Sequence, residues 1–177
     1  MTAEPVARSP LEGWRAELER LGAREVRPGA QVSLRVRDAA DPHPLAPADV
    51  PNTWTTIDGR EVLWLGPDEW LAVSEHEEPA VLLAWAETRL AGTFHAVVDV
   101  SDARAVLELG DADRLELLAA GCGLDLHPSR WRPGTCAQTL LGNVQVLLQE
   151  REGSTRVCVR PSFAGHLVRF LLAVRPA

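Results

Sequence analysis

The segment from Gly121 to Thr139, GCGLDLHPSRWRPGTCAQT, brings two thiols, an imidazole and a carboxylate close together in the chain. Cys122, His127 and Cys136 are residue types that bind zinc, but structural zinc sites normally take their ligands as close pairs, which this spacing lacks. Distant Cys158 would complete a set of four, yet it lies in an alternating, strand-like segment. The favoured interpretation places these cysteines at a helix end and in strands, with a metal-binding regulator as an alternative.

Nucleophilic catalysis by a cysteine would need a base, and only the fold could bring His127 or His95 to a thiol. Nothing in the neighbouring sequence supports such a pair, and free cysteines are usually buried. The Gly121-Cys-Gly123 sequence is similar to the start of a dinucleotide fingerprint, but it lacks the third glycine and follows a predicted helix instead of a strand. From these patterns alone we expect no catalytic residue, no cofactor site and no metal site.

The composition excludes several classes of function. The 177 residues include 25 acidic and 18 basic side chains, which gives a net charge of −7, and every basic one is arginine. No run of basic residues is present, so we expect neither a nucleic-acid partner nor a membrane partner, since both require clustered positive charge. Without lysine the chain can form no Schiff base and no conventional phosphate-binding P-loop.

The sequence also gives an expectation for location and redox state. The opening residues, MTAEPVARSP, lack the apolar core of a signal peptide, and no apolar run approaches the roughly 20 residues of a membrane span. We therefore expect a cytoplasmic protein. Three cysteines are too few for a disulfide framework in a chain that can build its own core, so we expect free thiols.

Hydrophobic periodicity predicts short strands alternating with amphipathic helices. The first helix is expected over about 10–22, with Ser9 as its N-cap and Gly22 at its end. A strand over 31–37 then leads into a proline-rich loop that extends to Trp54. The other predicted elements are strands on either side of turns at 66–67 and 101–102, a helix over 79–90, a helix capped by Asp111 and ending at Gly121, strands over 136–141, 143–149 and 155–160, and a helix from Ser162.

The order of elements indicates an internal repeat. EVLWLGPDEW and TRVCVRPSFA both run from an alternating strand through a proline turn to an aromatic residue, and each leads toward an amphipathic helix. We therefore predict an α+β fold in which one domain over 1–177 consists of two interleaved, pseudo-repeated subdomains of antiparallel sheet plus helix. The approximate halves are 24–92 and 93–177.

Two of the six tryptophans lie in proline-flanked, polar loops, where their own helix or strand does not explain a large indole. These are Trp54 and Trp131, and the latter stands between Arg130 and Arg132. Tryptophan and arginine are enriched where proteins bind partners, so these four residues are candidate partner contacts. The alternative is that the indoles fold back onto the core of the chain.

Five segments in register resemble the gamma subunit of bacterial heterotetrameric sarcosine oxidase: LGPDEWLAV, VDVSDARAVLEL, GLDLHP, PGTCAQTLL and RPSFAGHL. The resemblance extends over about Glu61 to Leu171. One departure is Pro161, where a second basic or small polar residue is expected. Proline is tolerated at the start of a helix, so this departure does not alter the resemblance.

The resemblance implies an accessory, non-catalytic subunit of a larger enzyme complex. That complex oxidatively demethylates sarcosine to glycine, reduces oxygen to hydrogen peroxide and passes the one-carbon unit to tetrahydrofolate. The implied partners are its alpha, beta and delta subunits, and FAD, FMN, NAD and tetrahydrofolate are expected in the larger subunits and not in this chain. The loop from Pro42 to Trp54 and the region around Trp131 are then the expected contacts.

More remotely, the sequence is similar to the folate-binding module of the glycine-cleavage aminomethyltransferases. In VDVSDARAVLELGDADRLELLAAGCGLDL, Asp125 stands where that transferase has its catalytic aspartate. This resemblance implies an α+β fold of two interleaved subdomains. It also implies the alternative function, a stand-alone folate-binding, aminomethyltransferase-like module in which Asp125 orients the folate amine.

Overall fold

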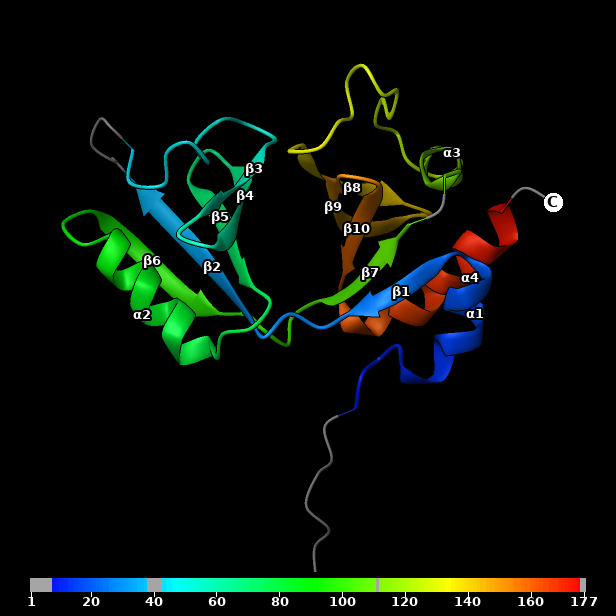
Figure 1. The fold of residues 1–177 in the computed structure, drawn as a ribbon, viewed down its shortest axis with the longest axis horizontal. Helices are drawn as coiled ribbons and strands as arrows, with labels where there is room; N and C mark the ends of the chain where they lie inside the picture. The colour runs from blue at the N-terminus through cyan, green and yellow to red at the C-terminus, as the bar shows by residue number, and fades with distance from the viewer. Residues whose placement is uncertain (1–7, 38–42, 111, 176–177) are drawn as a thin grey trace, which may run out of the picture.

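Two five-stranded antiparallel sheets with helices packed on them make up the computed structural model, which describes residues 8–37, 43–110 and 112–175 (Figure 1). The first lobe, at the left of Figure 1, contains β2 (Ala30–Arg37), β3 (Trp54–Ile57), β4 (Arg60–Gly66), β5 (Glu69–Ser74), α2 (Pro79–Arg89) and β6 (Phe94–Asp99). The second lobe contains η1 (Glu12–Trp14), α1 (Arg15–Arg20), β1 (Ala23–Val26), β7 (Ala105–Leu109), α3 (Arg114–Ala119), β8 (Cys136–Leu141), β9 (Val144–Arg151), β10 (Ser154–Val159), η2 (Pro161–Phe163) and α4 (Ala164–Val174).

The two sheets share one topology. Their strand orders are β3-β4-β5-β2-β6 and β8-β9-β10-β7-β1. In each sheet a three-stranded meander is followed along the chain by a helix, α2 or α4, while the strand preceding the meander takes the fourth place. The edge place beside it is filled by β6 in the first sheet and by the N-terminal β1 in the second. The predicted α+β fold of interleaved, pseudo-repeated units is therefore confirmed.

The two lobes do not coincide with the expected halves, 24–92 and 93–177, because β1 and β6 each join the sheet of the other half. β1 comes early in the chain but pairs with β7 of the second sheet, whereas β6 pairs with β2 of the first. The two segments that the sequence suggested as repeats are not equivalent strands of the two sheets, but differ by one strand position. EVLWLG forms β4, whose counterpart by sheet order is β9, while TRVCVR lies in β10, the counterpart of β5.

The strands predicted on either side of Ser101-Asp102 are present, but they do not form a hairpin. β6 ends at Asp99 in the first lobe and β7 begins at Ala105 in the second, so 100–104 carries the chain from one sheet to the other. We call this segment the crossover. Strand alternation alone cannot distinguish a tight turn from such a passage, because both are short and polar.

The N-terminal helix is present but shorter than expected. Ser9 Oγ accepts a hydrogen bond from the backbone N–H of Leu11 at 3.0 Å, but Leu11 and not the expected Ser9 is the N-cap of η1, which leads into α1. Gly22 ends the helix with a φ of 62°, a conformation that glycine adopts without strain. Leu18 and Leu21 are buried and fix α1 on the second lobe.

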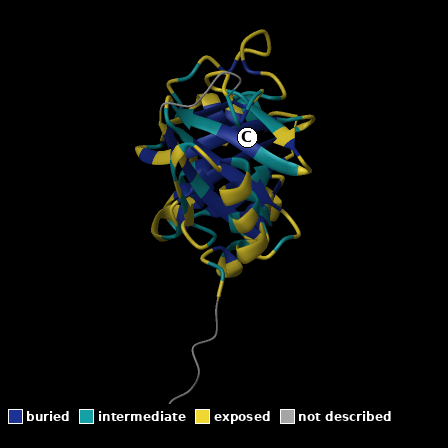
Figure 2. Ribbon diagram, turned by 90° about the vertical axis from the view of Figure 1, so that its left-hand side faces the viewer, coloured by how far each residue is buried: buried dark blue, intermediate teal, exposed yellow. Residues whose placement is uncertain are grey.

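Alternating side chains explain the core of the first lobe. Val32, Leu34 and Val36 of β2 are buried together with Leu82 and Ala86 of α2. Figure 2 shows buried residues concentrated in the strands and exposed residues on turns and on the outer sides of helices. Burying this apolar surface is the main source of stability for such a lobe.

The loop between β2 and β3 packs on its own lobe over the part that the structure describes. Leu45 and Ala48 are fully buried, and Trp70 Nε1 donates to the carbonyl of Ala48 at 2.8 Å. Pro42, the first residue of the expected contact loop, lies outside the described residues. The apolar side chains of this loop therefore anchor it to the first lobe.

In the second lobe, α4 buries Leu167, Val168 and Leu171. Its Phe170 ring occupies space that only glycine leaves open, because a Cβ at Gly121 would lie 2.3 Å from the ring. Asp111, the expected cap of α3, lies outside the described residues. Within the parts of the chain that the structure describes, no helix has both the length and the apolar character needed to cross a membrane.

Candidate functional site

The segment Gly121–Thr139 belongs to the second lobe and contacts the first, and we call it the brace segment. It connects α3 to β8 and approaches β3 at the top of Figure 1. The backbone N–H of Trp54 donates to the carbonyl of Gly134 at 2.8 Å, and that of Cys136 donates to the carbonyl of Asn52 at 2.9 Å. This part of the sequence therefore holds the two sheets together at one end.

Trp131 points into the protein, contrary to the prediction that its indole contacts a partner. The side chain is 5% exposed, and Nε1 donates to the carboxylate of Glu150 at 2.9 Å. Glu150 is 2% exposed and also accepts a hydrogen bond from Arg114 at 2.6 Å. Burial of a carboxylate is costly unless donors hydrogen-bond to it, and the indole of Trp131 supplies one of these donors. The alternative, an indole folded onto the chain's own core, applies to Trp131.

The other predicted contact residues differ in what they offer. Trp54 is half-buried. Its Nε1 donates to the carbonyl of Glu150 at 2.8 Å, and the guanidinium of Arg151 lies 5.1 Å from the centre of its ring. Trp54 therefore joins the two lobes. Arg130 and Arg132 are exposed on either side of buried Trp131. These two arginines stay predicted partner contacts.

Asp125 is an exposed turn residue. Its Oδ1 accepts a hydrogen bond from the backbone N–H of His127 at 3.0 Å, while His127 Nδ1 lies 2.8 Å from Ser129 Oγ. Such a side-chain-to-backbone bond is typical of aspartate in turns.

Cys136 and Cys158 are buried in one apolar cluster, whereas Cys122 packs against the core of the second lobe. Cys122 is half-buried with its Sγ 3.8 Å from Thr139 Oγ1, and Cys136 donates from Sγ to the carbonyl of Thr53 at 3.1 Å. Burial raises the pKa of Cys136 to about 12 and that of Cys158 to about 11, so both are neutral near pH 7. Among the described residues, no three His, Cys, Asp or Glu side chains are grouped as metal ligands.

A network of charges that the sequence patterns did not indicate links the two sheets. Arg156 of β10 is 4% exposed and bonds to Glu61 at 3.3 Å, to Glu108 at 2.9 Å, and to Glu75. Glu61 and Glu75 come from the first lobe, whereas Glu108 lies in β7. The available signal was a charge at an inward position of an alternating strand, since Arg156 shares its strand face with Cys158.

The network shifts the pKa values of its carboxyls. The hydrogen bond from Arg156 is the main reason that the pKa of Glu75 lies below its ordinary value. Burial is the largest single effect on Glu108 and raises its pKa, but hydrogen bonds and charge from Arg156 and Arg24 together lower it. Both carboxyls are therefore held ionised.

A cleft of about 370 Å³ lies between the lobes beside the crossover. Its polar lining comes from both sheets and from the crossover, and consists of Ser33, Glu69, Arg104, Gln138, Gln145 and Arg160. The Nη1 atom of Arg104 is buried and has no hydrogen-bond partner among the described residues. We call this cavity the interlobe cleft.

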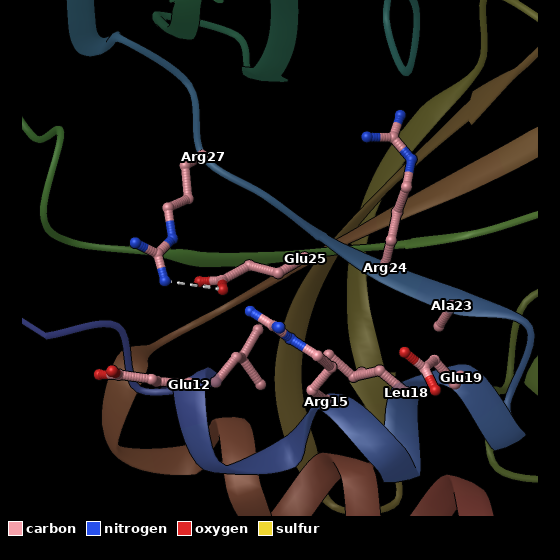
Figure 3. Close-up of a pocket in the computed structure, with 9 residues that line it drawn as sticks. Glu12, Arg15, Leu18, Glu19, Ala23, Arg24, Glu25 and Arg27 are labelled. Carbon is pink, nitrogen blue, oxygen red and sulfur yellow. Dashed lines mark hydrogen bonds and ion pairs between the residues drawn. The ribbon is translucent and has the colours of Figure 1, made fainter.

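A second hollow, of about 470 Å³, lies between the N-terminal helix and β1 (Figure 3). Charged side chains of both signs line it, among them Glu12, Arg15 and Glu19. Figure 3 shows Arg27 turned toward Glu25, and the two form an ion pair at 3.0 Å. With mixed charges along its wall, this hollow does not select one kind of ligand.

Comparison with known proteins shows which family this chain is similar to. A model of the family described as "Sarcosine oxidase, gamma subunit family" matches residues 38–175. The sarcosine oxidase subunit gamma of Corynebacterium sp. (strain U-96) is 38% identical over 127 residues, which cover 71% of this chain and 61% of that protein. The Arthrobacter sp. subunit gamma is 35% identical over 127 residues, covering 71% of this chain and 62% of that protein. Each match thus covers less than two thirds of the relative's length.

Two solved structures resemble the fold. A chain of the heterotetrameric sarcosine oxidase from Corynebacterium sp. U-96, solved in complex with pyrrole 2-carboxylate, superposes with a TM-score of 0.82 at 31% identity. That match covers 95% of this chain and 94% of the other. The glycine cleavage system aminomethyltransferase T from Bartonella henselae gives a TM-score of 0.64 at 13% identity, over 89% of this chain and 48% of that one. The second similarity is one of fold alone.

Proposed function

The chain belongs to the sarcosine oxidase gamma subunit family, and we propose that it is an accessory, non-catalytic subunit of a heterotetrameric sarcosine oxidase. The observation that carries the proposal is the structural match to a chain of such a complex, which extends over almost the full length of both chains. The arrangement of side chains agrees with this role. The buried polar groups Trp131, Glu150 and Arg156 hydrogen-bond within the chain, and Asp125 lies exposed in a turn.

In this proposal the complex oxidises sarcosine to glycine, forms hydrogen peroxide and transfers the one-carbon unit to tetrahydrofolate. The partners are the alpha, beta and delta subunits, and the larger ones hold FAD, FMN, NAD and tetrahydrofolate. This assignment is supported by Gly121, which follows helix α3 instead of a strand and has its Cβ position filled by the Phe170 ring. The cytoplasmic location stays a prediction.

The role of such a subunit is stabilisation. A partner that binds only the folded form of the large subunits lowers the free energy of that form relative to the unfolded states. The stabilisation grows with the ratio of the partner's concentration to its Kd. Hydrogen bonds of the segment Gly121–Thr139 and of Arg156 connect the two sheets, and an ordered surface loses little conformational entropy on binding.

Co-expression tests the proposal directly. The alpha, beta and delta subunits are produced with and without this chain and separated by size-exclusion chromatography. We expect this chain to co-elute with the large subunits and to raise their thermal unfolding temperature. A chain that elutes as a stable monomer in the presence of the large subunits would contradict the proposal.

A further inference from the structure

The interlobe cleft carries positive charge that this chain does not neutralise. Arg104 and Arg160 both line the cleft, and within the described parts of the chain neither forms an ion pair. The one acidic residue of the lining, Glu69, is already paired with Arg35 at 3.1 Å. The chain as a whole has a net charge of −7, so this cleft is a local exception.

Arg104 also has an unmet hydrogen-bonding requirement. Its Nη1 atom is buried without a partner among the described residues, and a buried donor left unpaired is destabilising. A guanidinium presents its donors as a planar fork that matches the two oxygens of a carboxylate. Because Arg104 lines the cleft, an Asp or Glu side chain that enters the cleft would be opposite in charge to this guanidinium.

Strand β6 presents exposed apolar side chains beside the cleft, next to Arg35 and Arg37 of β2, which lie opposite Ala96 and Phe94. Ser33 lines the cleft on β2 and lies directly opposite Val98 of β6, so the two side chains share a face of the sheet. Along that face of β6 follow Ala96 and Phe94, since side chains alternate along a strand. Val98 is 55% exposed and Phe94 is 76% exposed. β6 is an edge strand, whose other edge is not paired in the sheet.

We propose that the interlobe cleft and the adjoining face of β6 form the docking site for a segment of a large sarcosine oxidase subunit. This segment places an Asp or Glu carboxylate on Arg104 and apolar side chains on Val98 and Phe94. An interface of apolar contacts around a desolvated charged pair has the composition of known binding hot spots. The inference rests on the proposed function, because the occupant is a subunit of that complex.

Two variants and two matched controls test the docking site. Arg104→Gln removes the charge in the cleft, and Val98→Asp places a charge on the apolar face. Their controls are Arg20→Gln, at an exposed arginine of α1, and Val81→Asp, at a valine of α2 that is 50% exposed. The full-length variants are titrated by biolayer interferometry against a subcomplex of the large subunits assembled without this chain.

We expect Arg104→Gln and Val98→Asp each to raise Kd at least about tenfold, since hydrogen bonds to charged groups and buried apolar contacts both have effects of this size. The controls should bind like the wild type. Circular dichroism melting checks folding, and exposed Val98 gives a readout even if Arg104→Gln is poorly folded. If the wild type binds and either folded variant binds equally tightly, the docking site is wrong while the proposed function stands. If the wild type does not bind, the proposed function itself fails.

Discussion

The indole Nε1 of Trp131 lies 2.9 Å from a carboxylate oxygen of Glu150, and this pair connects the loop after α3 to strand β9. The same glutamate bonds to Arg114 and, through its backbone carbonyl, to Trp54 Nε1 at 2.8 Å. One residue of the second lobe thus fixes the brace segment, helix α3 and strand β3 of the first lobe. Glu150 is the structural centre of the region that the sequence suggested as a reactive site.

Replacing Glu150 should therefore destabilise the isolated chain. Glu150→Ala leaves the Arg114 guanidinium and the Trp131 indole without their acceptor, and removing one partner of a buried ion pair costs about 3 kcal/mol. Glu150→Gln keeps an acceptor for the indole and should cost less. Urea unfolding followed by tryptophan fluorescence measures both effects. The matched control is Glu152→Ala, at an exposed position, where we expect a change within about 0.5 kcal/mol. A Glu150→Ala variant as stable as this control would contradict the assigned role.

The Arg156 network predicts a loss of stability in acid. The pKa values of Glu75 and Glu108 are lowered from 4.5 in the folded chain, so the unfolded chain binds protons at higher pH than the folded one. Their contribution is fully present above about pH 4.5 and is lost as the pH falls through the folded-state pKa values. Urea unfolding at several pH values between 3 and 6 measures this slope.

The matched substitution for this slope is Arg156→Met, with exposed Arg20→Met as its control. Without the guanidinium both carboxyl pKa values should return toward their ordinary value, so stability should change less steeply with pH below 4.5. The variant should also be less stable at pH 7, because Glu61 and Glu108 lose a buried partner. An unchanged slope in Arg156→Met would show that other groups cause the acid dependence.

The three thiols should react at different rates. Half-buried Cys122 is accessible, whereas burial raises the pKa of Cys136 to about 12 and of Cys158 to about 11 and removes both from solvent. Ellman's reagent should therefore titrate one thiol quickly in the native chain and all three in urea. Cys122→Ser should abolish the fast phase, and a fast phase equivalent to three thiols would contradict this arrangement.

Much of the fold could be predicted because strand alternation and helix periodicity are local signals. The inward positions of β2, such as Val32 and Leu34, are buried as the pattern indicates. Which sheet a strand joins is not a local property, however. The strands before and after Ser101 both alternate, yet only long-range pairing sends β6 to the first sheet and β7 to the second. The exchange of β1 and β6 therefore could not be derived from periodicity.

The candidate site could be predicted only in part for a similar reason. Sequence position placed Trp131 in a polar loop, but the buried carboxylate that attracts it, Glu150, is distant in the chain. The roles of Arg156 and Arg104 likewise depend on the residues that surround them in the folded chain. The exposure of Arg130 and Arg132 agrees with the loop character of their segment.

Two histidines should titrate on opposite sides of the ordinary value of 6.5. Burial lowers the pKa of His43, with a weaker opposing effect of Asp49, whereas the hydrogen bonds that His95 donates to Glu87 and to the Thr93 carbonyl raise the pKa of His95. Two-dimensional NMR of the imidazole protons across pH 5 to 8 measures both. Glu87→Gln should bring the His95 pKa down and leave that of His43 unchanged. A His95 that titrates below His43 would contradict the structure.

The last prediction separates the accessory subunit from the folate-binding alternative. Asp125 is exposed, and its carboxylate accepts one backbone hydrogen bond from His127, so Asp125→Ala should leave assembly and sarcosine oxidation by the complex unchanged. Calorimetry of the full chain with tetrahydrofolate should show no binding heat for the wild type. The matched control is Asp102→Ala, at an exposed aspartate of the crossover. Micromolar binding that is lost in Asp125→Ala but kept in Asp102→Ala would instead favour the folate-binding module, because only a ligand held by Asp125 distinguishes these two carboxylates.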